Sequence, residues 1–507
     1  MVAAMMNVDF QNCFFFFILL CFFSLFCYSL FLRKPKVGCD LPPSPWSLPI
    51  IGHLHLLLSV LIHKSLHRLS SKYGPLLHLR IFNFPLLVAS SASAVYEIHR
   101  THDRIVSSRG LPPIEECLIF GSSSFINAPY GDHWKFTKRL IVTNMLGTQA
   151  LERSRGVRAD ELERFYTDLV NKAVKNESVE IFEEAMKLSH SSIYRMIMGK
   201  SFPEENGETE RVRGLVAEFV SLTKKFVLAK KLGVSLFRKN TMSASHRFDE
   251  LLDRILQEHE ENPDEHHGTE IMRVSMKACR ETKRITRSHI KSLFVELFLA
   301  GTETSAQAIQ WTMAEIVKNP KALVRLREEI DSVVGETRLV QETDLPNLPY
   351  LKAVVKEGLR LHPPSPLSVR TFQERCEIEG LCVQEKTTLV INAYAVMRDP
   401  DYWEDPDEFK PERFLASSRS EQAEESREQS LKYIPFGSGR RGCPGANLAS
   451  IFVETAVGTM VQGFDWGIKG REVNMDEAIG GMNLTMAHPL KLTPVVRTSN
   501  LLIPSFL

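Results

Sequence analysis

A single cysteine, Cys443, stands in a glycine-rich stretch that reads FGSGRRGCPG from Phe436 to Gly445. Glycines such as Gly437 let the backbone approach a flat ligand closely, and Arg441 lies two residues before the cysteine. Backbone N–H groups at a loop–helix junction stabilise a thiolate, and so does the positive end of a following helix. A thiolate held in this way is a candidate axial ligand for haem iron. The alternative is an ordinary buried structural cysteine.

The same loop also satisfies the dinucleotide pattern G-x-G-x-x-G, from Gly437 to Gly442. That pattern indicates a nucleotide site only after a strand, at the start of a helix, and with an acidic residue about 20 positions further on. Here Pro435 and Pro444 bracket the glycines, and position 462 is a glutamine. The sequence therefore disfavours a dinucleotide site.

A second group of chemical residues lies in the middle of a long predicted helix. Apolar residues recur at three-and-four spacing after Thr286, a plausible N-cap, and Pro320 ends the run, so the pattern predicts a helix over residues 286–318. Its centre reads AGTETS and contains Gly301, which costs about 1 kcal/mol relative to alanine in a helix. A glycine at this position suggests that something packs closely against the helix.

Glu303 and Thr304 place an acid beside an alcohol at that glycine. Dioxygen activation requires protons at the distal oxygen, which a threonine hydroxyl can donate and an acid–water chain can replenish. The alternative for Thr304 is a hydrogen bond to its own helix, at the carbonyl four residues earlier.

Several cations stand where they could balance the two propionates of a haem. Trp134, Lys138 and Arg139 can share one face of a predicted helix, and Arg370 lies in a β-rich stretch over residues 366–392. On their own, such cations usually lie on the solvated surface.

Glu357 and Arg360 are spaced to meet on one face of a helix predicted over residues 346–361, and Arg413 follows in an FKPERF motif. Most pairs of this kind are solvated. A buried cluster of one glutamate with two arginines is costly unless every charge is paired, so it would specify the fold.

Composition limits the class of protein. The chain has 507 residues with a formal net charge of +1, which argues against nucleic acid as the main partner. Its nine cysteines have no framework spacing, which is typical of a reducing compartment. No linker or repeat divides the chain, so we expect one large α-rich domain with a smaller β part.

The N-terminus predicts a membrane anchor, because Cys13 to Leu32 contains no charged residue and is long enough to cross a bilayer. Arg33, Lys34 and Lys36 follow, so the rest of the chain would face the cytosol. A cleaved signal peptide fits less well, since its basic residues would precede the apolar run. We expect an anchor over residues 1–36, a proline-rich hinge over 37–52 and the catalytic domain over 53–507.

Taken in order along the chain, these motifs resemble the cytochrome P450 superfamily in its plant microsomal form. The resemblance covers essentially the whole chain and implies the mainly α P450 fold with a smaller β part, preceded by a single transmembrane helix in the endoplasmic reticulum. It implies haem as cofactor and a monooxygenase reaction on a lipophilic substrate with O2. Electrons would come from NADPH through a separate NADPH–cytochrome P450 reductase, which agrees with the absence of a flavin or nicotinamide motif in the chain.

The resemblance also assigns residues. Cys443 would be the thiolate ligand of the metal, and Thr304 with Glu303 would serve oxygen activation. Glu357, Arg360 and Arg413 would form a structural cluster. The haem would be bound by the loop residues Phe436 and Gly437 and, at its propionates, by Trp134, Arg139, Arg370 and Arg441, with Lys138 as a further candidate.

Three stretches resemble a Brassicaceae subfamily associated with thalianol-type triterpene metabolism: RGLPPIEECLIFGSSSFINAPYGD, LERSRGVRADELERFY and GFDWGIKG. A triterpene or sterol-like alcohol is therefore the expected substrate class. The segments expected to line the pocket are Arg109 to Ala128, Leu297 to Thr304, Pro366 to Val369 and Met482 to Met486.

Two other functions stay open at this point. Enzymes that rearrange hydroperoxides on the same fold usually lack the helix threonine and the anchor, both of which this sequence has. The second alternative is a catalytically impaired haem-binding remnant, because the regions near 228–236 and 272–285 are shorter than in relatives.

Overall fold

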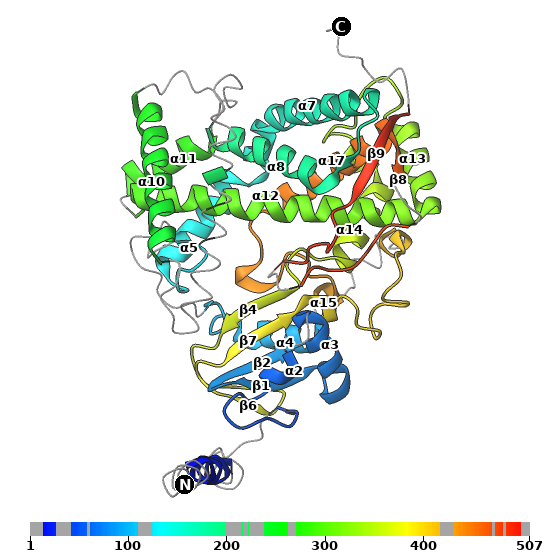
Figure 1. The fold of residues 1–507 in the computed structure, drawn as a ribbon. Coiled ribbons are helices and arrows are strands. Elements are labelled where there is room, and N and C mark those ends of the chain that lie inside the picture. Colours follow the sequence, from blue (N-terminus) through cyan, green and yellow to red (C-terminus); the bar gives the residue numbers. More distant parts are fainter. Residues whose placement is uncertain are drawn as a thin grey trace, which may run out of the picture.

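The computed structural model describes residues 14–26, 42–57, 61–109, 124–198, 238–261, 270–282, 284–415, 429–468, 472–479 and 483–497, with isolated residues between 214 and 222. Helices dominate, and a smaller β part lies against them (Figure 1). This confirms the predicted balance of helix and strand.

Most of the helices lie to one side of the four-stranded sheet, and a few lie directly beside it (Figure 1). The helices divide between a core around the long central helix and smaller clusters packed against the sheet. In chain order they are α2 (Leu54–Leu57), α3 (Ile62–Tyr73), α4 (Ala92–His102), α5 (Asp132–Arg139), α6 (Thr148–Arg153), α7 (Arg155–Val174), α8 (Ile181–Met198), α10 (Arg238–Glu261), α11 (Glu270–Thr282), α12 (Arg287–Lys318), α13 (Pro320–Val333), α14 (Pro349–Leu361), α15 (Ala393–Val396) and α17 (Ala446–Gly463).

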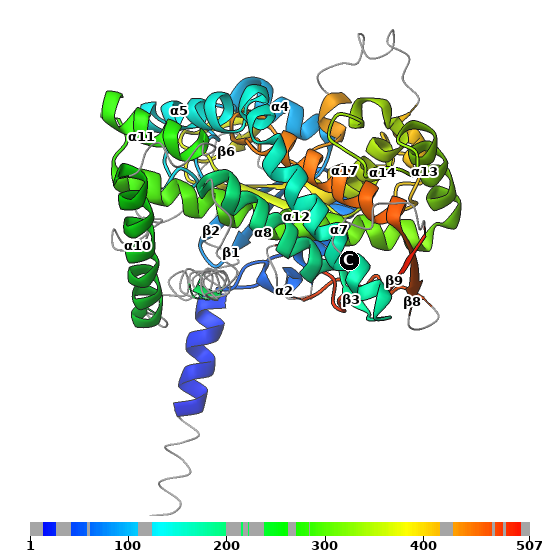
Figure 2. The same cartoon turned by 90° about the horizontal axis from the view of Figure 1, so that it is seen from above.

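The predicted long helix is α12, and its ends follow the expected signals. The Thr286 side chain accepts a hydrogen bond from the His289 backbone N–H as the N-cap, and α13 begins at Pro320. The helix packs along α8 and against α14 and α17 (Figures 1 and 2). Trp311 near its C-terminal end is fully buried. Helix α12 therefore runs through the centre of the helical part and carries the AGTETS motif there.

The four-stranded sheet has the order β1 (Leu76–Ile81), β2 (Phe84–Ala89), β7 (Thr388–Asn392) and β4 (Leu367–Thr371). Strands β2 and β7 are parallel, and the other pairs are antiparallel. A three-stranded sheet has the order β3 (Val179–Glu180), β9 (Lys491–Val496) and β8 (Phe464–Ile468), and β5 (Cys376–Ile378) pairs with β6 (Leu381–Val383). The antiparallel register of β4 places Arg370 opposite Leu389, and its side chain is buried.

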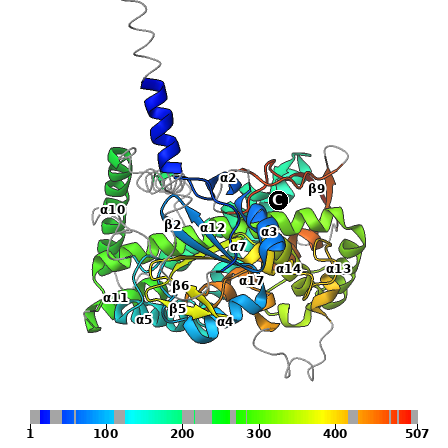
Figure 3. The ribbon, with the colours of Figure 1, turned by 90° about the horizontal axis from the view of Figure 1, so that it is seen from below.

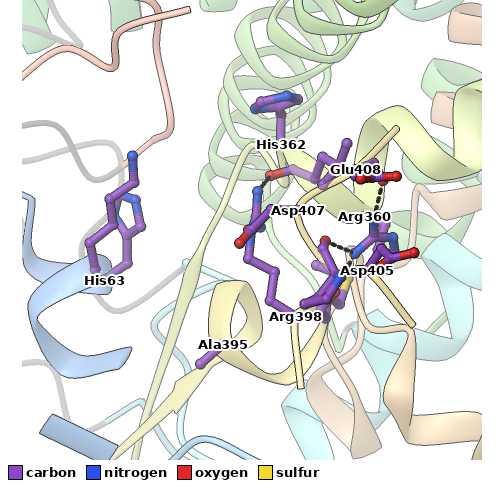
Figure 4. Close-up of polar contacts among 12 residues, drawn as sticks. His63, Arg360, His362, Ala395, Arg398, Asp405, Asp407 and Glu408 are labelled. Atoms are coloured by element: carbon purple, nitrogen blue, oxygen red, sulfur yellow. Dashed lines mark hydrogen bonds and ion pairs between the residues drawn. The ribbon is translucent and has the colours of Figure 1, made fainter. Parts of the chain in front are cut away.

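The glutamate–arginine cluster is buried and fully paired. Arg360 donates two hydrogen bonds to Glu357, at 2.7 and 2.8 Å, and Arg413 Nε donates a third at 2.9 Å. The remaining Arg360 N–H groups reach the backbone carbonyls of Met397, Pro406 and Glu408. Figure 4 shows Arg360 beside Asp405 and Glu408, with Arg398 and Asp407 next to it. The cluster thus ties α14 to the 397–413 segment from inside the core.

The N-terminal prediction is only partly covered by the structure. Residues 14–26 are helical with exposed phenylalanines, and this helix projects away from the body (Figures 2 and 3). The rest of the expected anchor and the start of the hinge lie outside the described residues. Among the described residues, no helix combines the length and the apolar character needed to cross a bilayer.

Candidate active site

A cavity of about 400 Å³ lies between α12, the 436–445 loop, the start of α17 and strand β4. Cys443 lies in its wall, and so do Gly301 and Thr304 of α12. Most of the wall is apolar, with residues such as Leu293, Leu297, Ile193 and Val369. The structure therefore brings the two main motifs of the sequence, the cysteine loop and AGTETS, to one cavity.

The loop that carries Cys443 is shaped by backbone hydrogen bonds. The Cys443 N–H donates to the Phe436 carbonyl at 2.9 Å, and the Gly442 N–H donates to the Gly439 carbonyl at 3.0 Å. Gly437 and Gly439 have φ values of 70° and 66°, in the left-handed region that favours glycine. The glycines therefore allow a tight turn that presents the cysteine to the cavity.

Burial raises the pKa of the Cys443 thiol above its ordinary value. The Gly445 backbone N–H opposes this shift by hydrogen bonding to the sulfur, and the positive charges of Lys138 and Arg109 oppose it electrostatically. Lys138 Nζ also donates to the Gly442 carbonyl at 2.7 Å, which fixes the cation beside the loop. These groups all favour a negative sulfur, as a metal-bound thiolate requires.

Four cationic side chains line this cavity: Arg109, Lys138, Arg370 and Arg441. Burial and, to a lesser degree, the charge of Arg109 lower the pKa of Arg370 to about 9 and that of Arg441 to about 10. Buried like charges repel, so this arrangement is stable only with anions between them. The cavity therefore suits a ligand with negative groups at this end.

Among the described residues of the cavity wall, two buried donors have no hydrogen-bond partner, Arg109 Nε and Trp134 Nε1. Both residues line the cavity. A thiol on one wall, unpartnered donors and clustered cations fit haem, whose iron would bind the thiolate and whose propionates would accept hydrogen bonds from the donors.

Arg441 also organises the wall opposite α12. Its guanidinium lies 4.5 Å above the Trp134 ring, and Nε donates to the Ser107 carbonyl at 2.7 Å. Other N–H groups donate to the carbonyls of Ile126 and Ala128. Arg441 thus joins the cysteine loop to the 107–128 region, much of which, residues 110–123, lies outside the described residues.

The AGTETS motif is only partly as expected. Thr304 lines the cavity, but its hydroxyl donates to the Ala300 carbonyl, which was the alternative interpretation of the sequence. A Cβ at Gly301 would lie 2.4 Å from Ile193 Cδ1 of α8, so a close side chain explains this glycine. Glu303 points elsewhere, because it is not part of the cavity wall and accepts a hydrogen bond from Asn483 Nδ2 at 3.1 Å.

The structure places the other predicted residues as follows. Phe436, Gly437, Trp134, Lys138, Arg370 and Arg441 line the cavity. Arg139 does not, since it is exposed at the end of α5. Of the two neighbouring cations on this helix, the structure therefore brings Lys138 to the site. In the expected pocket segments, residues 110–123 and Met482 lie outside the described residues.

Sequence reasoning placed Arg109 in an expected pocket segment without assigning it as a cation of the site, and it missed Glu296. Glu296 of α12 is buried, and it accepts hydrogen bonds from the backbone N–H groups of Phe125 and Ile126, both at 3.1 Å, and from the Ser124 hydroxyl. A signal was present: Glu296 is a lone charge in the apolar run from Leu293 to Leu299 of a central helix. It anchors the turn at 124–127 to α12.

Glu296 leads to a prediction about pH. Burial raises its pKa to about 7, although its hydrogen bonds and Arg109 oppose the shift. A carboxyl group with a raised folded-state pKa stabilises the fold most below its unfolded pKa, near 4.5, and this contribution is lost as pH rises through 7. Between pH 5 and 8, the unfolding free energy of the wild-type protein should therefore fall by on the order of 3 kcal/mol because of Glu296. Glu296→Gln should not show this fall.

The measurement is thermal unfolding of the holoprotein across that pH range. The control is Glu281→Gln, at an exposed position near Lys277, which should keep the wild-type pH profile. An unchanged pH profile in Glu296→Gln would show that Glu296 does not titrate in this window.

The sequence matches the family described as Cytochrome P450 over residues 42–493. The chain belongs to the cytochrome P450 family. It is 64% identical to Cytochrome P450 705A20 of Arabidopsis thaliana, over 99% of this chain and 100% of that protein. It is 63% identical to Cytochrome P450 705A5 of the same plant, over 98% and 100%. These relatives confirm the resemblance to a Brassicaceae subfamily.

More distant proteins also resemble this chain. Beta-amyrin 24-hydroxylase of Glycine max is 37% identical over 94% of this chain and 98% of that protein. A solved zebrafish cytochrome P450 with progesterone has a TM-score of 0.75 at 24% identity and covers 86% of this chain and 100% of that one, which shows the shared fold.

Membership of the family establishes a P450 monooxygenase with haem as cofactor and electrons from NADPH through a reductase. O2 and a small plant metabolite are its substrates. The alternative of an impaired remnant is not supported, since close relatives match over nearly the whole chain. Of the two regions that prompted it, 228–236 lies outside the described residues, whereas 270–282 forms helix α11.

Proposed function

We propose that this P450 hydroxylates a triterpene or sterol-like alcohol, with desaturation or C–C cleavage as related outcomes of the same chemistry. The observation that carries the proposal is the apolar wall facing Cys443, made by Leu293, Leu297 and Ile193. Such a wall suits a large hydrocarbon skeleton. Further support comes from relatives in Arabidopsis thaliana and from the similarity to a beta-amyrin 24-hydroxylase.

In this proposal Cys443 is the metal ligand, held by the Gly445 N–H and flanked by Lys138. When bound, haem supplies the oxidising chemistry, which the thiolate promotes by pushing electron density towards O–O cleavage. Arg109, Lys138, Arg370, Arg441 and Trp134 would hold the propionates. The protein thus contributes ligation, orientation and charge balance.

Thr304 would hold a proton-carrying water in the cavity. The Thr304 hydroxyl donates its hydrogen to the Ala300 carbonyl, so the hydroxyl oxygen can act only as an acceptor towards the cavity. Glu303, one residue before and held by Asn483, would supply protons to that water from the other side of the helix. The two residues would thus supply protons to the cavity, while the apolar wall keeps bulk water out of it.

The same proposal includes the membrane. A single-pass anchor over residues 1–36 and a hinge over 37–52 would place the catalytic domain, 53–507, on the cytosolic face of the endoplasmic reticulum. Support comes from the uncharged run of the N-terminal sequence with basic residues directly after it, and from exposed phenylalanines on helical residues 14–26. A lipophilic substrate would reach the enzyme from the bilayer.

The experiment co-expresses the chain with a plant NADPH–cytochrome P450 reductase in yeast microsomes and supplies triterpene alcohols, sterols and fatty acids in parallel. We expect a product with one added oxygen atom from a triterpene alcohol, dependent on NADPH. Turnover of fatty acids alone would contradict the substrate class while leaving the monooxygenase reaction intact.

Replacing Thr304 with valine should separate electron use from product formation. Valine keeps the shape but removes the hydroxyl oxygen, so NADPH consumption should stay within about 2-fold while product per NADPH falls by about 10-fold or more. The matched control is Thr302→Val on the same helix, because the buried Thr302 hydroxyl donates to the Phe298 carbonyl and does not line the cavity. Equal coupling in both variants would rule out this role for Thr304.

A further inference from the structure

A three-residue hydrogen-bond chain lies behind the cysteine loop. Ser438 Oγ lies 2.9 Å from His99 Nε2, and His99 Nδ1 lies 3.1 Å from Asp103 Oδ1. His99 and Asp103 belong to the C-terminal end of α4, one turn apart, and Ser438 belongs to the loop that carries Cys443. These hydrogen bonds therefore link helix α4 to a loop more than 300 residues later in the sequence.

The order of donors along this chain follows from the groups. A carboxylate only accepts, so His99 Nδ1 carries the proton and donates to Asp103. In the neutral imidazole Nε2 is then an acceptor, and the Ser438 hydroxyl donates to it. The His99 side chain is 11% exposed and that of Asp103 is 19% exposed, so the chain is largely shielded from water.

Gly439, the next loop residue, shows how closely the pair is packed. A Cβ at Gly439 would lie 2.5 Å from both His99 Nδ1 and Asp103 Oδ1. Gly439 also has a positive φ of 66°. The imidazole and the carboxylate therefore occupy the space beside the loop backbone, and they limit where that backbone can lie.

Asp103 holds the loop at a second point. Its carboxylate accepts from the Arg440 backbone N–H at 3.3 Å and pairs with Arg440 Nε at 3.1 Å. Although burial raises its pKa, hydrogen bonds from His99 and the Arg440 backbone and the charge of Arg440 bring the Asp103 pKa below its ordinary value. An aspartate at the C-terminal end of a helix is unfavourable for the helix dipole, so its position here is explained by what it binds.

We propose that His99, oriented by Asp103, is a positioning residue that holds the Ser438–Arg440 side of the loop and thereby keeps Cys443 in place as a thiolate ligand. Hydrogen bonds of this kind around a metal site orient the ligand and tune its basicity. The three residue types also form hydrolase triads. Here Ser438 belongs to the wall around the cysteine where haem fits, so its hydroxyl serves the loop. This inference rests on Cys443 being the haem ligand.

The test measures how fast the ferrous–CO complex converts from the strongly red-shifted thiolate band to the ordinary thiol-type band. A single hydrogen bond contributes about 1 kcal/mol, or roughly 5-fold in an equilibrium or rate. We expect His99→Leu and Ser438→Ala each to convert about 5- to 10-fold faster than wild type. Because both changes break the same chain, the double variant should convert no more than about 2-fold faster than His99→Leu alone.

The control on the same helix is Glu97→Gln, which removes an exposed pair with Arg100 and does not touch the loop. It should convert at the wild-type rate. His99→Gln, which retains an amide group in place of the imidazole, should recover part of the lost stability of the thiolate band. Haem content and thermal unfolding are measured in parallel, and Ser438→Ala, the smallest change, keeps the test valid if His99→Leu fails to fold.

Wild-type conversion rates in Ser438→Ala and His99→Leu would overturn the proposal, as would fully additive effects in the double variant. A wild-type protein without any thiolate band would overturn the Cys443 assignment and this inference together. A normal wild-type band with unaffected variants would overturn the positioning role alone.

Discussion

We expect Cys443→Ala to abolish NADPH-driven oxidation and to remove the thiolate band of the ferrous–CO complex, while the protein still folds. Among the described residues, Cys443 is the one cysteine in the cavity wall. Alanine removes the sulfur, so the described cavity wall is left without the thiolate that haem-thiolate oxidation requires. The measurement is product formation in reductase-containing microsomes, where the variant should match microsomes that lack the protein.

The matched control is Cys376→Ala. Burial raises the pKa of Cys376 to about 11, so this thiol in β5 stays protonated, and it does not line the cavity. The control variant should keep the thiolate band and its turnover. Oxidation that survives in Cys443→Ala would refute the ligand assignment.

We expect Glu357→Ala to prevent the accumulation of folded holoprotein. The Glu357 and Arg360 side chains are fully buried, and removal of the carboxylate leaves the Arg360 charge buried without its partner. Breaking a buried pair costs about 3–5 kcal/mol, a large part of the 5–15 kcal/mol that typically stabilises a folded protein. Haem content per expressed protein and urea unfolding of any folded fraction measure the effect.

The control uses an exposed pair of the same spacing. Glu97 and Arg100 are also three residues apart on a helix, and the Arg100 side chain is 60% exposed. Glu97→Ala should cost less than about 1 kcal/mol. If Glu357→Ala cost no more than Glu97→Ala, the cluster would not have the structural role that its burial indicates.

Much of the fold was predictable because its signals are local. The helix from Arg287 to Lys318 follows from an N-cap, an apolar period and a proline, and strands β4 to β7 all lie in the predicted β-rich stretch over residues 366–392. The tight turn in the cysteine loop was predictable because glycine readily adopts positive φ values, and Gly437 and Gly439 both do so here.

The rest depends on contacts that no local pattern records. Lys138 and Arg139 are adjacent, and only the packing of α5 and of the π-helical turn after it (Leu140–Met145) decides which one enters the cavity. The pair His99–Asp103 looks like an ordinary surface pair one turn apart on a helix, because its partner Ser438 is far away in the sequence. Thr304 also shows that a hydroxyl can line a cavity and still donate to its own helix.

The most direct test of the central claim is the ferrous–CO difference spectrum of the full chain in microsomes. We predict a Soret band at the strongly red-shifted position of thiolate-ligated haem, because Cys443 lies in the cavity wall with an N–H donor and cations that favour a negative sulfur. A band at the ordinary thiol or imidazole position, or no band at all, would contradict the account of Cys443 as the haem ligand.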